Sequence, residues 1–153
     1  MERSRDVPLT AGPALVARDV LPPILVVDDD PVAWARVAAF VGSLRLANPL
    51  SWLQTGEAAL EHLLARGPPA LILLDIHMEG MSGIDVLRWL RATEGFADVP
   101  VVMLTASADL DEVEISHALG AVSYLVKPVG FGALRDLIRE LDTPWALLAK
   151  DDA

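Results

Sequence analysis

The stretch Leu71-Ile72-Leu73-Leu74-Asp75 decides the fold that this sequence predicts, because four aliphatic residues run directly into a carboxylate. Gly67-Pro68-Pro69 precedes the run and Gly80 follows it, and residues of this kind interrupt regular structure. A short apolar run between such breaks is typical of a strand buried on both faces, as in a parallel sheet. We therefore predict a central buried strand that carries Asp75 at its carboxyl end.

Three other apolar runs end on polar residues in the same way. They are 24–27 before Asp28-Asp29-Asp30, 101–104 before Thr105, and 124–126 before Lys127. Parallel strands end at the same edge of a sheet, and ligands of open α/β folds bind there. Carboxylates, a hydroxyl and an ammonium group at one edge would suit a divalent metal ion and a phosphoryl group, because Mg²⁺ prefers carboxylate and phosphate oxygens.

The segments between these runs carry helix signals. Asp30-Pro31 and Ser82-Gly83 are predicted helix starts. A third helix starts at Ser107 or Asp109, and Glu112 is placed to complete a capping box with Asp109. Gly120 is placed to end that third helix. We also predict a strand over 50–53, a helix over 56–65 that buries Leu63 and Leu64, and a last helix after residue 130. Strand and helix then alternate five times, without an internal repeat. This predicts an α/β fold, a doubly wound five-stranded parallel sheet with five helices.

Composition excludes several classes of protein. The 153 residues suit one domain, and no apolar run approaches the roughly 20 residues that span a bilayer. The sequence has no cysteine, which excludes disulfides and thiolate metal sites and favours a cytoplasmic location. The net charge of −10 disfavours direct binding to nucleic acid or to anionic membranes.

Three regions differ in character. Residues 1–22 mix charges with several prolines and are predicted to form a flexible arm, residues 23–141 form the folded domain, and residues 142–153 form an apolar tail. The tail is too short for a DNA-binding unit, so we expect a domain that acts alone. Trp145, Leu147 and Leu148 would leave an exposed apolar patch, and such patches often mark contacts between proteins.

Taken in order, the segments 24–31, 71–87, 101–107 and 123–128 resemble the receiver domain of two-component response regulators. The resemblance covers about residues 23–141. It implies a flavodoxin-like fold and a phosphoryl group accepted on an aspartate from a histidine kinase or a histidine phosphotransfer protein. It also implies a signalling domain that assists its own phosphorylation and dephosphorylation, and not an enzyme with a separate substrate.

The resemblance assigns the acidic residues. Asp75 is the implied phosphoacceptor, and Asp28 and Asp29 are implied to hold Mg²⁺ together with it. His77 is implied to add its backbone carbonyl to the metal, and its side chain occupies a position that tunes the lifetime of the phosphoryl group in the family. Glu79 departs from the family, which often has proline there.

The remaining implied roles concern the switch. Thr105 would hydrogen-bond the bound phosphoryl group and Lys127 would pair with it, while Tyr124 matches an aromatic position whose orientation follows the threonine. Receivers commonly dimerise through the fourth helix, fifth strand and fifth helix, and we expect a homodimer here, extended by the tail. The tail also resembles those of single-domain receivers that serve phytochrome-type histidine kinases.

Two alternatives stay open. The opening Asp28-x-Asp30 also resembles haloacid-dehalogenase-type phosphohydrolases, in which Asp28 would be the nucleophile and Asp30 the acid/base, with Thr105 and Lys127 as later elements. That alternative leaves Asp75 without a role. The other alternative is a degenerate receiver that acts only as a binding module.

Overall fold

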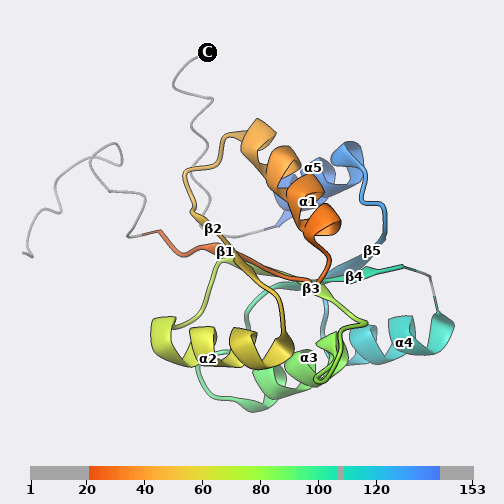
Figure 1. Ribbon diagram of the computed structural model, residues 1–153. Helices are drawn as coiled ribbons and strands as arrows, with labels where there is room; N and C mark the ends of the chain where they lie inside the picture. The colour runs from red at the N-terminus through yellow and green to blue at the C-terminus, as the bar shows by residue number, and fades with distance from the viewer. Residues whose placement is uncertain (1–20, 107–108, 142–153) are drawn as a thin grey trace, which may run out of the picture.

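A computed structural model describes residues 21–106 and 109–141 of the chain. Its five strands form one sheet in the order β2-β1-β3-β4-β5, and every neighbouring pair is parallel. Helices α1 and α5 cover one face of the sheet, and α2, α3 and α4 cover the other (Figure 1). The predicted flavodoxin-like, doubly wound fold is therefore confirmed.

Strands and helices alternate along the whole described part of the chain. In order they are β1 (Ile24–Val27), α1 (Pro31–Leu44), β2 (Leu50–Leu53), α2 (Gly56–Arg66), β3 (Leu71–Asp75), α3 (Gly83–Ala92), β4 (Val101–Thr105), α4 (Leu110–Ala118), β5 (Ser123–Val126) and α5 (Phe131–Glu140).

Strand β3 lies at the centre of the sheet, as its apolar run predicts. All five of its residues are buried, and it pairs with β1 on one side and with β4 on the other. The register places Leu74 opposite Val27 and Asp75 opposite Leu104. The polar residues after these strands therefore meet at one edge of the sheet, which we call the carboxyl edge.

The core consists of two apolar layers because successive side chains of a strand point to opposite faces. Leu25 and Ile72 belong to the layer under α2 and α3, whereas Ile24 and Leu71 belong to the layer under α1 and α5. The predicted burial of Leu64 was wrong. Its side chain is 68% exposed, because α2 turns the neighbouring Leu63 toward the sheet instead.

Two predicted helix starts are confirmed with their hydrogen bonds. Asp30 Oδ1 accepts the Val32 N–H at 2.9 Å, and Pro31 occupies the first turn of α1. Ser82 and Asp85 form a reciprocal capping box at the start of α3. Both caps lie beside the carboxyl edge and so fix the loops that surround it.

The start of α4 differs from its prediction. Asp109 caps the helix by accepting the N–H groups of Asp111 and Glu112, as expected. The Glu112 carboxylate, however, contacts His77 and is not the second half of a capping box. Gly120 follows the helix with a φ of +81°, in the left-handed region that favours glycine.

Gly83 connects β3 closely to α3. A Cβ atom at this position would lie 2.1 Å from the backbone oxygen of Asp75, which is far inside van der Waals contact. The Gly83 N–H donates to the carbonyl of Ile76 at 2.9 Å. Only glycine allows this approach, so Gly83 helps to set the position of Asp75.

The predicted arm, except residues 21–22, and the predicted tail with Trp145, Leu147 and Leu148 lie outside the described residues. Within 21–106 and 109–141, no helix combines the length and the apolarity needed to cross a membrane.

Candidate functional site

Three carboxylates meet at the carboxyl edge. One oxygen from each of Asp28, Asp29 and Asp75 lies within 4.8 Å of the others. Asp28 and Asp75 are buried, whereas Asp29 is exposed to solvent. The parallel register of β1 and β3 produces this cluster, because both strands end at the same level of the sheet.

Lys127 brings the only ammonium group of the described residues to these acids. Its Nζ lies 2.8 Å from Asp28 Oδ2 and 3.3 Å from Asp75 Oδ1. The backbone N–H of Lys127 donates to the carbonyl of Thr105 at 2.7 Å, which extends the pairing of β4 with β5 to the lysine. One cation thus faces two buried anions.

The pKa is raised in both members of this pair, for different reasons. The pKa of Asp75 is raised to about 6, first because the carboxyl group is buried and then because Asp28 lies close, while Lys127 opposes the rise. Burial lowers the pKa of Lys127, but its hydrogen bond to Asp28 and the charge of Asp75 outweigh burial and leave it raised. The acids therefore favour a bound cation.

The donor set fits Mg²⁺. Asp28 Oδ1 accepts the Asp30 N–H at 3.0 Å, but Asp28 Oδ2 is enclosed and has no hydrogen-bond donor in good geometry beyond its ion pair with Lys127. A buried carboxylate oxygen of this kind is costly unless a cation approaches it. Three carboxylates with solvent access at Asp29 are the kind of ligands that Mg²⁺ uses together with water and phosphate.

Thr105 and Tyr124 lie on neighbouring strands and on the same face of the sheet. Thr105 is buried at the end of β4 and lies opposite Val126 of β5. Two residues earlier in both strands, Met103 lies opposite Tyr124. Tyr124 is 40% exposed. The structure thus places Thr105 at the carboxyl edge, one residue beyond the Leu104 that pairs with Asp75, and Tyr124 at the surface formed by α4 and β5.

His77 makes a contact that sequence reasoning missed. Its Nε2 lies 2.5 Å from Glu112 Oε2, so the loop after Asp75 contacts α4 directly. The second carboxylate oxygen of Glu112 is enclosed and has no hydrogen-bond partner. The two residues are 35 positions apart, and no spacing rule links positions in a loop and a later helix.

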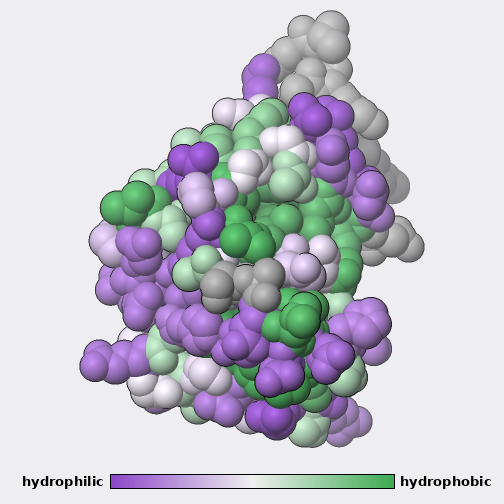
Figure 2. All heavy atoms as spheres, turned by 90° about the vertical axis from the view of Figure 1, so that its right-hand side faces the viewer, coloured by the Kyte–Doolittle hydropathy of each residue, from purple (hydrophilic) through white to green (hydrophobic). Residues whose placement is uncertain are grey.

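An apolar cavity opens beside Lys127. It has a volume of about 330 Å³ and lies between the start of α1 and the loop after β5. Arg36 of α1 donates from Nε to the carbonyl of Val129 in that loop at 2.6 Å. Figure 2 shows the face at the carboxyl edge, where hydrophobic side chains gather around a hollow near its centre and hydrophilic ones cover most of the rest. The apolar residues that line the cavity are Val32, Ala33, Val37, Leu104, Ala106, Pro128 and Val129.

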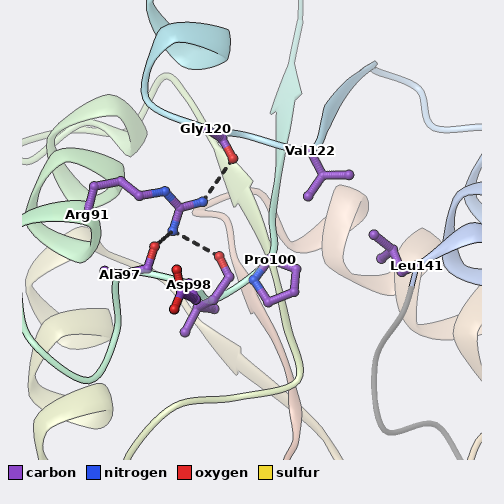
Figure 3. A pocket seen from close by; sticks show the side chains of 8 residues that line it. Arg91, Ala97, Asp98, Pro100, Gly120, Val122 and Leu141 are labelled. Atoms are coloured by element: carbon purple, nitrogen blue, oxygen red, sulfur yellow. Dashed lines mark hydrogen bonds between the residues drawn. The ribbon is translucent and has the colours of Figure 1, made fainter.

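A second cavity, of about 360 Å³, lies at the opposite edge of the sheet. Arg91 of α3 points into it and donates to the carbonyls of Ala97, Val99 and Gly120 (Figure 3), and its Nε donates to Leu119. Burial lowers the pKa of Arg91. Its contacts join α3 to the loops before β4 and β5, which is a structural role.

Comparisons with known proteins agree with this geometry. Residues 24–139 match the response regulator receiver domain family. The bacteriophytochrome response regulator RtBRR superposes with a TM-score of 0.75 at 35% identity, covering 84% of this chain and 82% of that one. The bacteriophytochrome response regulator AtBRR gives a TM-score of 0.73 at 32% identity, covering 84% and 97%. The probable methanogenesis regulatory protein FilR2 of Methanothrix harundinacea is 31% identical over 90% of this chain and 91% of its own length.

The chain therefore belongs to the response regulator receiver domain family, whose members are phosphoacceptor domains of two-component signalling. Receiver domains bind Mg²⁺ at an acidic pocket and interact with histidine kinases. Other curated relatives are longer than this chain, which spans between 25% and 45% of their length.

Proposed function

We propose that Asp75 accepts a phosphoryl group from a histidine kinase or a histidine phosphotransfer protein in a Mg²⁺-dependent reaction. One observation carries the proposal: Asp75 is buried at the carboxyl edge, in a cluster with Asp28 and Asp29 and 3.3 Å from Lys127. A lone buried aspartate would be an ordinary strand end. An aspartate among two further acids and an ammonium group has the parts that phosphoryl transfer requires.

In the proposed reaction, a carboxylate oxygen of Asp75 attacks the phosphorus of a phosphohistidine. The P–N bond breaks, and the leaving imidazole keeps the electron pair. Mg²⁺, held by Asp28, Asp29, Asp75 and the backbone carbonyl of His77, would neutralise the negative charge that otherwise keeps a carboxylate and a phosphate apart.

The ammonium group and the hydroxyl complete the proposed site. Lys127 pairs with a phosphoryl oxygen, since its Nζ already faces the Asp75 carboxylate that receives the group. Thr105, buried at the end of the next strand, donates a hydrogen bond to another phosphoryl oxygen. The shift of Thr105 toward the phosphoryl group opens space for Tyr124 on the same face, and two packings of that ring form the proposed switch.

Output is proposed to pass through the surface of α4, β5 and α5 as a homodimer. The support is a group of exposed hydrophobic residues on α4, on β5 and directly before β5: Ile115, Val122, Tyr124 and Val126, exposed by 38% to 49%. The two bacteriophytochrome response regulators among the structural relatives support a phytochrome-type histidine kinase as the phosphodonor. We further propose that the domain acts in the cytoplasm.

The geometry disfavours the phosphohydrolase alternative. Asp28 is fully buried and accepts the Asp30 N–H, while the Asp30 carboxylate caps α1 and so is not free to act as an acid or base. The degenerate receiver alternative predicts that no phosphoryl group is accepted at all.

Intact-mass spectrometry after incubation with acetyl phosphate tests the proposal. The wild-type chain should gain the mass of one phosphoryl group with Mg²⁺ and none with a chelator. Asp75→Asn, which keeps the shape of the side chain, should gain none in either case. Phosphorylation of Asp75→Asn at the wild-type extent would contradict the proposal.

A further inference from the structure

Strand β2 holds both backbone polar groups of Asp28, which is the most buried residue of the acidic cluster. The Asp28 N–H donates to the carbonyl of Leu53 at 3.0 Å. The Asp28 carbonyl accepts a hydrogen bond from the indole Nε1 of Trp52 at 2.7 Å. The second contact belongs to no sheet ladder, so the side chain of one particular residue supplies it.

The same indole also contacts helix α1. The rings of Trp52 and Trp34 stack with their centroids 5.2 Å apart and their planes 7° apart. Trp34 is four residues after Asp30, which caps α1. The stacked pair therefore connects β2 to the first turns of α1, with Trp52 bonded to Asp28 at the start of loop 28–30 and Trp34 four residues after its end.

We propose that Trp52 is a positioning residue for the metal site, and this rests on the proposed Mg²⁺-dependent function. Its indole N–H fixes the carbonyl of Asp28, and its ring, held by Trp34, fixes the loop that carries Asp28 and Asp29. Neither ring is a metal ligand. Their effect is to hold two carboxylates at the distance from Asp75 at which one cation can bind all three.

The energetic argument concerns the carbonyl of Asp28. Trp52→Phe keeps an aromatic ring that can stack on Trp34, but it removes the only hydrogen-bond donor that the indole has. The carbonyl must then find another donor, and the loop has to move to reach one. Loss of partners that orient metal ligands typically lowers metal affinity by about tenfold to a hundredfold.

The test is the Mg²⁺ dissociation constant of the full chain, measured by calorimetry without any phosphodonor. Trp52→Phe should bind Mg²⁺ at least about tenfold more weakly than wild type. Trp89→Phe is the matched control, because Trp89 packs on Phe96 in the other core layer, and it should bind as wild type does. Circular dichroism at the same temperature confirms that each variant is folded, so a change in affinity reports the site and not general instability.

A second readout separates positioning from chemistry. If Trp52 acts only through the acids, saturating Mg²⁺ should restore phosphorylation of Trp52→Phe by acetyl phosphate to the wild-type rate. Wild-type affinity in Trp52→Phe would overturn the inference while leaving the proposed function intact. A wild-type chain that binds no Mg²⁺ would overturn the proposed function itself. If Trp52→Phe does not fold, Trp34→Leu carries the test, because it removes the stacking and keeps the donor; unchanged affinity there would also overturn the inference.

Discussion

The Oε2 atom of Glu112, on α4, lies 2.5 Å from the Nε2 atom of His77, which belongs to the loop that follows Asp75. This contact joins the helix of the proposed output surface to the loop beside the proposed phosphoacceptor. It adds to the proposed switch pair of Thr105 and Tyr124 as a connection between the two regions. A change in the loop on phosphorylation would therefore reach α4 through a side-chain contact.

A double-mutant cycle with His77→Gln and Glu112→Gln should show a coupling of about 0.5 to 1 kcal/mol in the free energy of unfolding. The expected value is small because the His77 side chain is 54% exposed, and exposed ion pairs contribute little. Urea denaturation of the four proteins measures it. Additive effects of the two substitutions would contradict the contact.

The raised pKa of Asp75 predicts a pH-dependent stability difference. The folded-state pKa of about 6 lies above the ordinary value of 3.8, so the folded state binds more protons between these values. The contribution of Asp75 to stability therefore falls as the pH rises from about 4 to 6 and stays unfavourable at pH 7. Without metal, Asp75→Asn should be more stable than wild type at pH 7, by on the order of 1 to 3 kcal/mol.

Thermal unfolding at pH 4 and pH 7 measures this difference, which should largely vanish at pH 4. Glu114→Gln, on the exposed surface of α4, is the control for removal of a carboxylate and should change little at either pH. An Asp75→Asn protein no more stable than wild type at pH 7 would contradict the assigned burial and charge.

A bound metal ion should restore the stability that the folded protein loses when the ammonium group of Lys127 is removed. Lys127→Met removes the ammonium group that faces Asp28 and Asp75, so the metal-free protein should lose about 3 kcal/mol of stability. Mg²⁺ should then raise the melting temperature of Lys127→Met more than that of wild type. Arg139→Met, an exposed cation on α5, should respond to Mg²⁺ as wild type does. Equal shifts in all three proteins would contradict the prediction.

Arg91 is predicted to support the fold and not the site. Its guanidinium donates to four backbone carbonyls, so Arg91→Ala should cost about 3 kcal/mol or more. Arg88→Ala on the same helix removes only an exposed pair at 3.8 Å and should cost less than about 1 kcal/mol. Denaturation compares the two. Weaker Mg²⁺ binding by a folded Arg91→Ala protein would show that Arg91 acts on the site as well.

The sequence was enough to predict the fold because its signals agree at each level. The run 71–75 is buried as predicted, Asp30 and Ser82 cap helices as predicted, and Gly120 follows α4 as predicted. The wrong predictions have local causes. Leu64 and Leu63 are adjacent, and only the exact rotation of α2 decides which of them faces the sheet.

The site could be predicted only in part. Residues at the end of a strand or directly after it, such as Asp75, Asp28 and Lys127, are brought together by the parallel topology alone. Contacts made by long side chains from other elements follow no such rule. The spacing of Glu112 from Asp109 predicts a capping role, but its carboxylate contacts His77. The sequence around Trp52 predicts an ordinary strand residue, but its indole N–H donates to the carbonyl of Asp28.

The site of phosphorylation tests the central claim most directly. Wild-type protein treated with acetyl phosphate and Mg²⁺ can be reduced with borohydride, which converts an aspartyl phosphate to homoserine, and then mapped by peptide mass spectrometry. The account predicts homoserine at position 75 and unmodified aspartate at positions 28 and 29. Homoserine at position 28 with unmodified Asp75 would contradict it.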